Sequence, residues 1–339
     1  MRHASNEATS APRRRRTIRR LAVGVVASIL GLVALGVLYE VVAAAASERR
    51  FPPPGVRHEV DGVVLHLDCV GAGGPTVVLE SGAGAGALAW AWVQRHLARE
   101  VRVCAYDRAG YGWSAGGGDD VDPDRVVARL HGLLRAAEEP GPFVLVGHSL
   151  GGHYVRVFSD VHPDEVAGVV LVDARHPALP ERMPGYDEWI AQGERTLQIG
   201  LALSYVGALR LMGDVFGSME ALPEGVGEAM VATTMRPRHM RAHTAEVRSL
   251  PAIDARAAAV TDVGERPLVV LAAGAIDDDH LDLRTWLELQ EDLADLAVGA
   301  RFSVLDGADH LGIVLDAGHA AVVSEAIMDV VREVRGDIR

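Results

Sequence analysis

One short segment constrains this chain more than any other: a serine held between glycines at the end of an apolar run. The segment reads Gly-His-Ser-Leu-Gly-Gly over residues 147–152, and it follows the apolar residues 143–146 directly. A short buried strand therefore enters the segment, and a stretch able to form a helix, residues 154–158, leaves it. On so tight a turn the side chain of Ser149 is forced out above the sheet, because the flanking glycines let neighbouring backbone pass close by. The pattern makes Ser149 a candidate nucleophile.

Predicted strands alternate with predicted helices along most of the chain, which indicates an α/β fold with a mostly parallel sheet covered on both faces. Apolar runs predict strands at residues 63–70, 76–79, 101–106, 143–146, 166–172, 268–271 and 301–305. Apolar residues at helical spacing predict helices at residues 88–100, 123–138 and 320–334. Residues 174–266 lack clear strand signals and are prone to form helices, so we expect an inserted helical segment there.

The N-terminal part of the chain has the pattern of a membrane anchor. Residues 1–20 contain seven arginines and one glutamate, and an uncharged apolar run follows at residues 21–39. Such a run is about long enough to cross a hydrocarbon core, and the basic cluster should stay on the cytoplasmic side. We therefore expect a basic cytoplasmic tail at residues 1–20, a transmembrane helix or signal-anchor at residues 21–46, and a proline-stiffened linker at residues 47–56.

This pattern predicts a single-pass protein of the cell membrane, with the rest of the chain on the extracytoplasmic side. The alternative is secretion after signal cleavage, because the four alanines at residues 43–46 offer a cleavage site.

The composition of the chain excludes several classes of partner and cofactor. The net charge is −13, and residues 1–20 carry +6, so the remainder carries about −19. That balance argues against nucleic acid as a partner of the folded part. The chain has no lysine, which excludes lysine Schiff-base chemistry, including that of pyridoxal phosphate, and the phosphate-binding lysine of a nucleotide loop. We expect no cofactor.

Metal-binding patterns are weak. His239, His243 and Glu246 have helical spacing, but one face of a polar helix explains them equally well. Residues 277–280 lack the calcium-loop pattern, and two cysteines alone cannot form a structural zinc site. We expect no metal site.

A serine nucleophile needs a base, and the base needs an acid that orients it. His310 lies in a loop directly after the last predicted strand and is the candidate base. At this point the chain resembles the α/β-hydrolase superfamily, over residues 57–335. Three motifs carry the resemblance: the serine segment at residues 147–152, the segment Asp-Arg-Ala-Gly-Tyr-Gly-Trp-Ser at residues 107–114, and the loop at residues 306–310.

The resemblance implies the α/β-hydrolase fold, with a mostly parallel eight-stranded sheet and a helical cap inserted after strand six. Here the fold would be preceded by one transmembrane helix. The core would comprise residues 57–173 and 267–339, and the cap residues 174–266.

The resemblance also implies roles for residues near Ser149. The backbone N–H groups of Leu150 and Ala83 would form an oxyanion hole, although serine stands at position 81 where the family usually has histidine. The acid could follow strand seven, as Asp277 does, or strand six, as Asp173 does. Asp277 is slightly favoured by its Gly-x-x-Asp arrangement, and both remain open.

The resemblance further implies that the second and fourth strands are neighbours, and Cys69 and Cys104 lie on these two strands. An oxidising compartment outside the membrane would allow a disulfide between them. The alternative is a pair of small, buried apolar side chains.

Together these features predict a serine hydrolase that cleaves an ester, an amide or a related acyl compound with a hydrophobic portion, through an acyl-enzyme. A serine at position 149 argues against haloalkane and epoxide hydrolysis, for which the resemblance would require an aspartate. Two alternatives remain: a non-catalytic binding module of the same fold, and a cofactor-free haloperoxidase or C–C hydrolase that uses the same three residues. The expected partners are a small-molecule acyl substrate and the membrane; the sequence does not indicate the oligomeric state.

Overall fold

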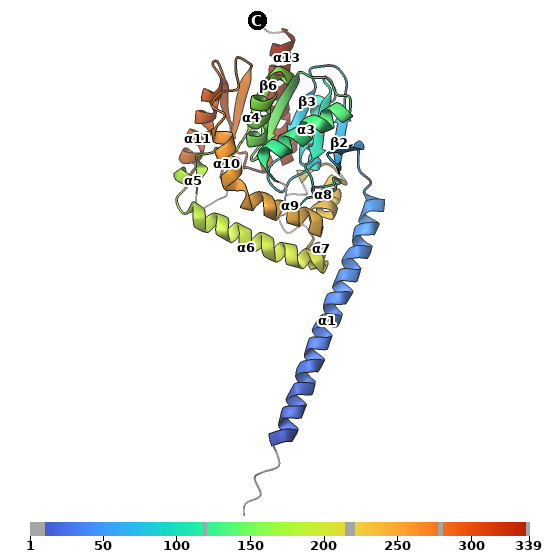
Figure 1. Ribbon diagram of the computed structural model, residues 1–339. Helices are drawn as coiled ribbons and strands as arrows, with labels where there is room; N and C mark the ends of the chain where they lie inside the picture. The colour runs from blue at the N-terminus through green and yellow to red at the C-terminus, as the bar shows by residue number, and fades with distance from the viewer. Residues whose placement is uncertain (1–10, 118–120, 214–220, 277–280, 337–339) are drawn as a thin grey trace, which may run out of the picture.

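The computed structural model describes residues 11–117, 121–213, 221–276 and 281–336. In this part of the chain an eight-stranded sheet is covered by helices on both faces, and one long helix, α1, projects away from the body (Figure 1). The strand order is β1-β2-β4-β3-β5-β6-β7-β8. Strands β1, β2 and β4 pair antiparallel, and the other neighbours pair parallel. The predicted fold, a mostly parallel sheet of eight strands, is confirmed.

The strands are β1 (Val56–Val60), β2 (Val63–Val70), β3 (Val77–Glu80), β4 (Val103–Asp107), β5 (Phe143–His148), β6 (Val166–Val172), β7 (Leu268–Ala273) and β8 (Arg301–Leu305). The central strands β3 to β7 are buried along nearly their whole length. That burial explains why they appear in the sequence as continuous apolar runs. Strand β1 is an edge strand with several exposed residues, and for that reason no apolar run predicted it.

The helices that cover the sheet are α2 (Ala91–Leu97), α3 (Pro123–Ala136), α4 (Gly151–Val161), α11 (Leu283–Asp292), α12 (Gly312–Leu315) and α13 (Ala317–Arg335). Helix α3 illustrates how the sequence specifies them. Asp122 caps it by accepting a hydrogen bond from the N–H of Arg125, and Pro123 occupies its first turn. Its apolar side chains, among them Val127, Leu130 and Leu134, are buried on one face.

A helical cap is inserted between β6 and β7, as predicted. It comprises α5 (Leu179–Arg182), α6 (Tyr186–Tyr205), α7 (Ala208–Met212), α8 (Val226–Thr234), α9 (Pro237–Arg248) and α10 (Leu250–Ala258). Helices α6 and α9 cross the end of the body at which the parallel strands finish (Figure 1). The cap therefore lies over the carboxyl ends of the strands, where ligands bind in open α/β sheets.

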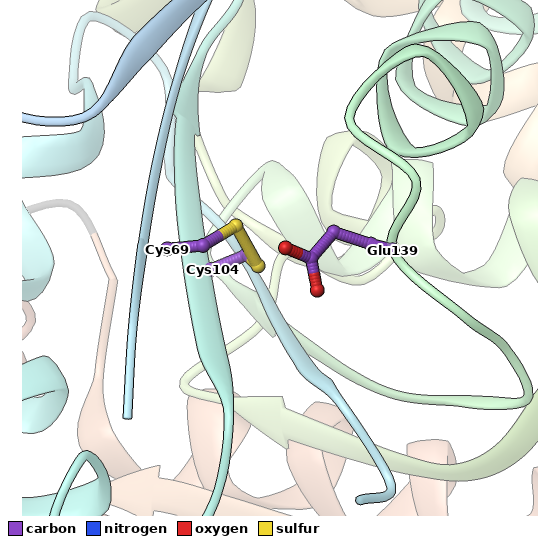
Figure 2. A group of neighbouring side chains, drawn as sticks. All are labelled: Cys69, Cys104 and Glu139. Carbon is purple, nitrogen blue, oxygen red and sulfur yellow. A yellow bond between two sulfur atoms is a disulfide. The ribbon is translucent and has the colours of Figure 1, made fainter. Parts of the chain in front are cut away.

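Of the two alternatives left open for Cys69 and Cys104, the structure has the disulfide. Strand β2 pairs with β4 so that Cys69 lies directly opposite Cys104, with the two Cα atoms 4.0 Å apart and the sulfurs bonded (Figure 2). The carboxylate of Glu139 lies beside this bond and accepts hydrogen bonds from Arg102. The disulfide thus joins the antiparallel edge of the sheet to its parallel centre.

Helix α1 (Ala11–Arg50) is longer than the expected span, and the expected linker at residues 47–56 is partly wrong. The helix continues through residues 47–50, because the alanines before them favour helix and the next proline after the first turn of α1 is at position 52. The connection to β1 is therefore only residues 51–55. By length and hydropathy, residues 15–50 could cross a membrane, and the side chains of the apolar segment are largely exposed.

Candidate active site

Ser149 occupies the tight turn that the sequence predicted. It lies between β5 and α4 with a backbone φ of +53°, in the left-handed region that non-glycine residues rarely adopt. Glycine is required at the neighbouring positions 147 and 151 because backbone atoms pass very close to them. A Cβ at Gly151 would lie 2.3 Å from the carbonyl oxygen of Glu80, and one at Gly147 would lie 2.7 Å from the carbonyl oxygen of Gly151. The strained turn is therefore built around the serine and exposes it.

A chain of hydrogen bonds runs from Ser149 through His310 to Asp173. The Nε2 atom of His310 lies 3.0 Å from Ser149 Oγ, and its Nδ1 atom lies 2.5 Å from Asp173 Oδ2. Because an ionised carboxylate can only accept, Nδ1 carries the proton, and the Nε2 lone pair accepts from the serine hydroxyl. This is the arrangement that prepares a serine for nucleophilic attack.

Both oxygens of the Asp173 carboxylate accept hydrogen bonds. Its Oδ1 atom accepts from the backbone N–H of Ala273 at 2.8 Å and from Nε1–H of Trp286 at 2.7 Å. Burial disfavours the charged carboxylate, but the hydrogen bonds and the charge of His310 outweigh it, and the pKa of Asp173 is lowered. Asp173 is thus an anion at neutral pH.

The pKa of His310 is shifted in the opposite direction to that of Asp173. Desolvation disfavours its charged form, but the hydrogen bond to Asp173 and the charge of that carboxylate outweigh it, and the pKa of His310 is raised. The side chain of His310 remains 46% exposed while that of Asp173 is 1% exposed. The base therefore faces the open side of the site, and the acid lies beneath it.

Of the two candidate acids, the structure joins Asp173 to His310. Asp173 stands at the end of β6 with a φ of +43°. Asp277, which the sequence slightly favoured, lies outside the described residues. The sequence could not rank the two because the carboxyl ends of β6 and β7 are adjacent in the sheet.

The two expected oxyanion donors lie on the segments that meet at Ser149. Leu150 follows the serine directly and precedes α4. Ala83 lies in the loop after β3, where the neighbouring Gly82 is so close that a Cβ on it would be 3.0 Å from Ser149 Cβ. Among the described residues, neither the N–H of Leu150 nor that of Ala83 is paired with an acceptor. Both remain free to bind a developing negative charge.

Arg108, within the segment at residues 107–114, holds this loop. Its guanidinium donates to the carbonyl oxygens of Ser81 and Gly82, each at 2.7 Å. It also forms buried ion pairs with Glu80 at 2.5 Å and with Glu246 at 2.9 Å. The loop opposite Ser149 is therefore positioned by a buried cation between two carboxylates.

The cap helix α9 completes this support. His239, His243 and Glu246 lie on one face of this helix, as their spacing indicated. That face is packed against the loop: His239 and Glu246 are buried, and the ring of His243 lies against Gly84. Nε2–H of His239 donates to the carbonyl oxygen of Gly84 at 2.9 Å, and burial lowers the pKa of His239 to about 3. Glu246 accepts from the hydroxyl of Tyr111 at 2.6 Å. The three residues belong to the packing between the cap and the loop.

The described residues contain two groups that could offer three metal ligands. In one, Cys69 and Cys104 are oxidised to the disulfide, so their sulfurs are not thiolate ligands. The other consists of His131, His162 and Glu165, between α3 and the end of α4. No spacing pattern in the sequence indicated this second group.

His148 is a neighbour of the candidate base for which the sequence predicted no role. Its Nε2–H donates to the backbone carbonyl of His310 at 2.8 Å, and the two imidazole rings lie 4.9 Å apart. Burial, reinforced by the nearby His310, lowers the pKa of His148 to about 3, so it is neutral. Its position between glycine and the candidate serine was the only signal in the sequence. We infer that it holds the loop that carries His310.

A pocket of about 330 Å³ opens beside these residues. Its polar lining consists of Ser149, Asp173, Arg175 and His310. The rest of the lining is mainly apolar, with contributions from the cap and from around α11: Leu179, Met183, Trp189, Ile276, Leu281 and Trp286. The guanidinium of Arg175 is itself paired with Asp254 through two contacts of 2.7 Å. The pocket suits a ligand with an apolar portion.

Comparisons with known proteins bear on the family and the fold. Residues 77–326 match the family model described as the alpha/beta hydrolase family. The chain is 43% identical over 82 residues to an uncharacterized protein of Schizosaccharomyces pombe, which covers 24% of this chain and 15% of that protein. It is 33% identical over 113 residues to lipase LipV of Mycobacterium tuberculosis, covering 32% and 41%. The chain thus spans less than two thirds of the length of these curated relatives.

Among solved structures, a thermophilic esterase from Thermogutta terrifontis superimposes with a TM-score of 0.61 at 20% identity, over 82% of this chain and 98% of that one. At that identity the likeness shows the fold alone. The family match covers most of the chain, and the chain belongs to the alpha/beta hydrolase family.

Proposed function

We propose that this protein is a serine hydrolase that cleaves an ester, an amide or a related acyl compound with a hydrophobic portion. The observation that carries the proposal is the hydrogen-bonded chain of Asp173, His310 and Ser149 at the wall of an apolar pocket. Relatives and structural neighbours named lipase and esterase are in keeping with it.

In this reaction Ser149 Oγ attacks the acyl carbon while His310 Nε2 takes the hydroxyl proton. Asp173 holds the ring and stabilises the imidazolium that forms. The N–H groups of Leu150 and Ala83 stabilise the negative oxygen of the tetrahedral intermediate. His310 then gives its proton to the leaving group, and water, activated by the same histidine, releases the acyl group from Ser149.

The test is active-site labelling with a fluorophosphonate probe, together with turnover of an acyl-ester library. Ser149→Ala should lose labelling and at least about 10³-fold in turnover, because the three residues act as a unit. Ser159→Ala is the matched control: this serine lies in the adjacent α4, is buried, and donates only to the carbonyl of Val155. It should keep both activities.

Retention of turnover in Ser149→Ala would end the proposal. Absence of labelling in the unmodified protein would favour the non-catalytic binding module. Labelling of Ser149 with no ester or amide turnover would favour the cofactor-free haloperoxidase or the C–C hydrolase.

We further propose that α1 remains attached and anchors the protein by a single span, with residues 1–20 in the cytoplasm and the catalytic part outside. The exposed apolar surface of α1 and the flanking arginines support this. The disulfide is in keeping with an oxidising compartment. The end of α1 is also bound to the cap, since Glu40 pairs with Arg210 at 2.8 Å and Glu48 with Arg236 at 3.0 Å. Cleavage after residue 46 would remove the first of these pairs.

A further inference from the structure

We propose that the corner between α6 and α7 is a second membrane-contact surface, seated at the outer boundary of the bilayer that α1 crosses. The corner is defined here as residues 199–212. The proposal rests on the proposed span of α1, and it adds a lipid surface as the partner of the cap.

The corner is in direct contact with α1. A Cβ at Gly36 would lie 2.7 Å from the carbonyl oxygen of Val206, and a Cβ at Gly207 would lie 2.4 Å from the ring of Tyr39. The lack of a side chain at both glycines is therefore what allows the two segments to approach so closely. One turn further on, Glu40 forms its ion pair with Arg210.

These contacts fix the depth of the corner. Gly36 and Tyr39 belong to the uncharged run at residues 21–39, which is the segment that must fill the hydrocarbon core. Gly36 lies three residues before the end of that run, or about 4.5 Å inside it at the rise of an α-helix. The apolar character continues after Glu40 through residues 41–46, and counting those residues in the span would place the corner deeper. Val206 therefore lies at or within the boundary of the hydrocarbon core.

The exposed side chains of the corner suit that environment. Ile199 is 62% exposed, Tyr205 45%, Leu211 72% and Met212 57%. They follow one another along the part of the cap next to α1. The exposed positions of α6 before Ile199 are instead polar: Asp187, Glu188, Gln192, Arg195, Thr196 and Gln198. Apolar exposure thus increases along α6 toward the anchor, as expected of a surface that dips into a membrane at one end.

Helix α6 also connects this surface to the pocket. In Figure 1 it crosses the side of the cap that faces away from the sheet, and its far end meets α7 beside α1. Trp189 near its start lines the pocket, and Tyr205 at its end belongs to the corner. Their separation of 16 positions corresponds to about 24 Å of helix. If the corner contacts the membrane, the pocket therefore lies close to the membrane surface, where acyl esters with long chains accumulate.

The experiment places an environment-sensitive fluorophore on the full chain in phosphatidylglycerol–phosphatidylethanolamine vesicles. The two native cysteines are bonded to each other, so under non-reducing conditions a maleimide label reports only an introduced thiol. The labelled variants are Leu211→Cys in the corner, Leu30→Cys in the middle of α1, and Val298→Cys. Val298 is a fully exposed apolar residue just before the amino end of β8, at the opposite end of the sheet from the cap.

Quenching by nitroxide lipids and by aqueous iodide then separates the outcomes. We expect the label at position 211 to be quenched by a nitroxide near the glycerol level and shielded from iodide. The label at position 30 should be quenched by a nitroxide deep in the acyl chains, and the label at position 298 only by iodide.

Other outcomes contradict the proposal. If position 30 behaves as expected while position 211 matches position 298, α1 crosses the membrane but the corner does not contact it. If position 30 is not quenched by lipid, the span itself fails. Shielding of position 211 from iodide without lipid quenching would indicate a second protein copy and overturn the proposal.

A second measurement links the surface to turnover. Leu211→Glu places a charge in the corner, on a side chain exposed enough not to disturb the fold. It should reduce turnover of an ester carried in vesicles by about tenfold, because a charge at this depth opposes insertion, and leave that of a short water-soluble ester unchanged. An equal loss of turnover on both substrates would mean that the substitution damages the active site. Unchanged turnover on both substrates would contradict a role of the corner in delivering substrate from the membrane.

Discussion

Three hydrogen bonds hold the carboxylate of Asp173: one from His310, one from the backbone of Ala273 and one from Trp286. The last two come from β7 and α11, so the carboxylate is fixed independently of the histidine it orients. A group whose position is set by the surrounding structure loses little entropy when it holds its partner. At the scale of single residues, Asp173 is therefore well suited to be the acid.

The first prediction concerns the choice between the two aspartates. Asp173→Asn should reduce kcat by about 10⁴-fold, since an amide in place of the carboxylate favours the wrong histidine tautomer. Asp277→Asn, the matched change at the other candidate, should cost far less. Steady-state kinetics of both variants on the same ester tests this. A large loss confined to Asp277→Asn would reverse the assignment.

The pH profile gives a separate prediction for the same pair. His310 must be neutral to accept the serine proton, so activity should rise with pH as its imidazolium loses a proton. Asp173 raises the pKa of His310, and removing that charge should lower the pKa. In Asp173→Asn the acid limb of the residual kcat/KM profile should therefore move to lower pH. An acid limb that stays in place or moves to higher pH would show that Asp173 does not set the protonation of His310.

At the scale of elements, the loop after β3 depends on contacts from the segment that follows β4 and from the cap. Arg108 donates to two loop carbonyls and pairs with Glu80 and Glu246. Glu246 belongs to α9, and His239 of the same helix donates to Gly84. The cap therefore helps to position the loop that carries the proposed oxyanion donor.

The third prediction tests this support with Arg108→Lys. An ammonium keeps the charge but lacks the planar fork that reaches both carbonyls and both carboxylates. We expect kcat to fall by about tenfold to a hundredfold, less than the loss of an oxyanion donor itself, because the loop becomes less well positioned. Arg256→Lys is the control. That arginine also contacts two carboxylates, Asp124 and Asp160, but at the surface, and the change should leave kcat unchanged. Equal kinetics in the two variants would contradict the role of Arg108.

At the scale of the whole molecule, α1 is both a candidate anchor and a structural part of the cap. Its last turns carry two glutamates that pair with arginines of the cap, and Arg236 is itself nearly buried. Removal of the helix would therefore leave Arg236 without its partner Glu48. The residue at which a truncated, soluble form begins should therefore affect its stability.

The fourth prediction concerns extraction and truncation. Detergent should be required to release the full chain from membranes, whereas a chain beginning at Phe51 should be soluble and active. A chain beginning at Glu40 keeps both ion pairs, so it should have the higher melting temperature of the two. N-terminal sequencing of the natural protein is the decisive measurement for the anchor. A new N-terminus at residues 44–47 would show signal cleavage and contradict a retained anchor.

Much of this protein is determined by local sequence. The apolar runs predicted most of the strands because β3 to β7 are buried on both faces and so carry apolar residues at nearly every position. The turn around Ser149 was predictable because only glycine fits where backbone passes within 2.3 Å of the point that a Cβ would occupy, as at Gly151. The anchor pattern at residues 1–39 likewise depends only on composition and length.

Other features were decided by the tertiary structure alone. The partner of His310 depends on which strand end lies beneath it, and β6 and β7 are neighbours whose ends look alike in sequence. The spacing of His239, His243 and Glu246 gives the helix face but not what packs against it, and only the folded cap brings that face onto the loop opposite Ser149. The contact between Gly36 and Val206 joins residues 170 positions apart. Such contacts between distant residues arise from the packing of elements, which local propensity and periodicity do not encode.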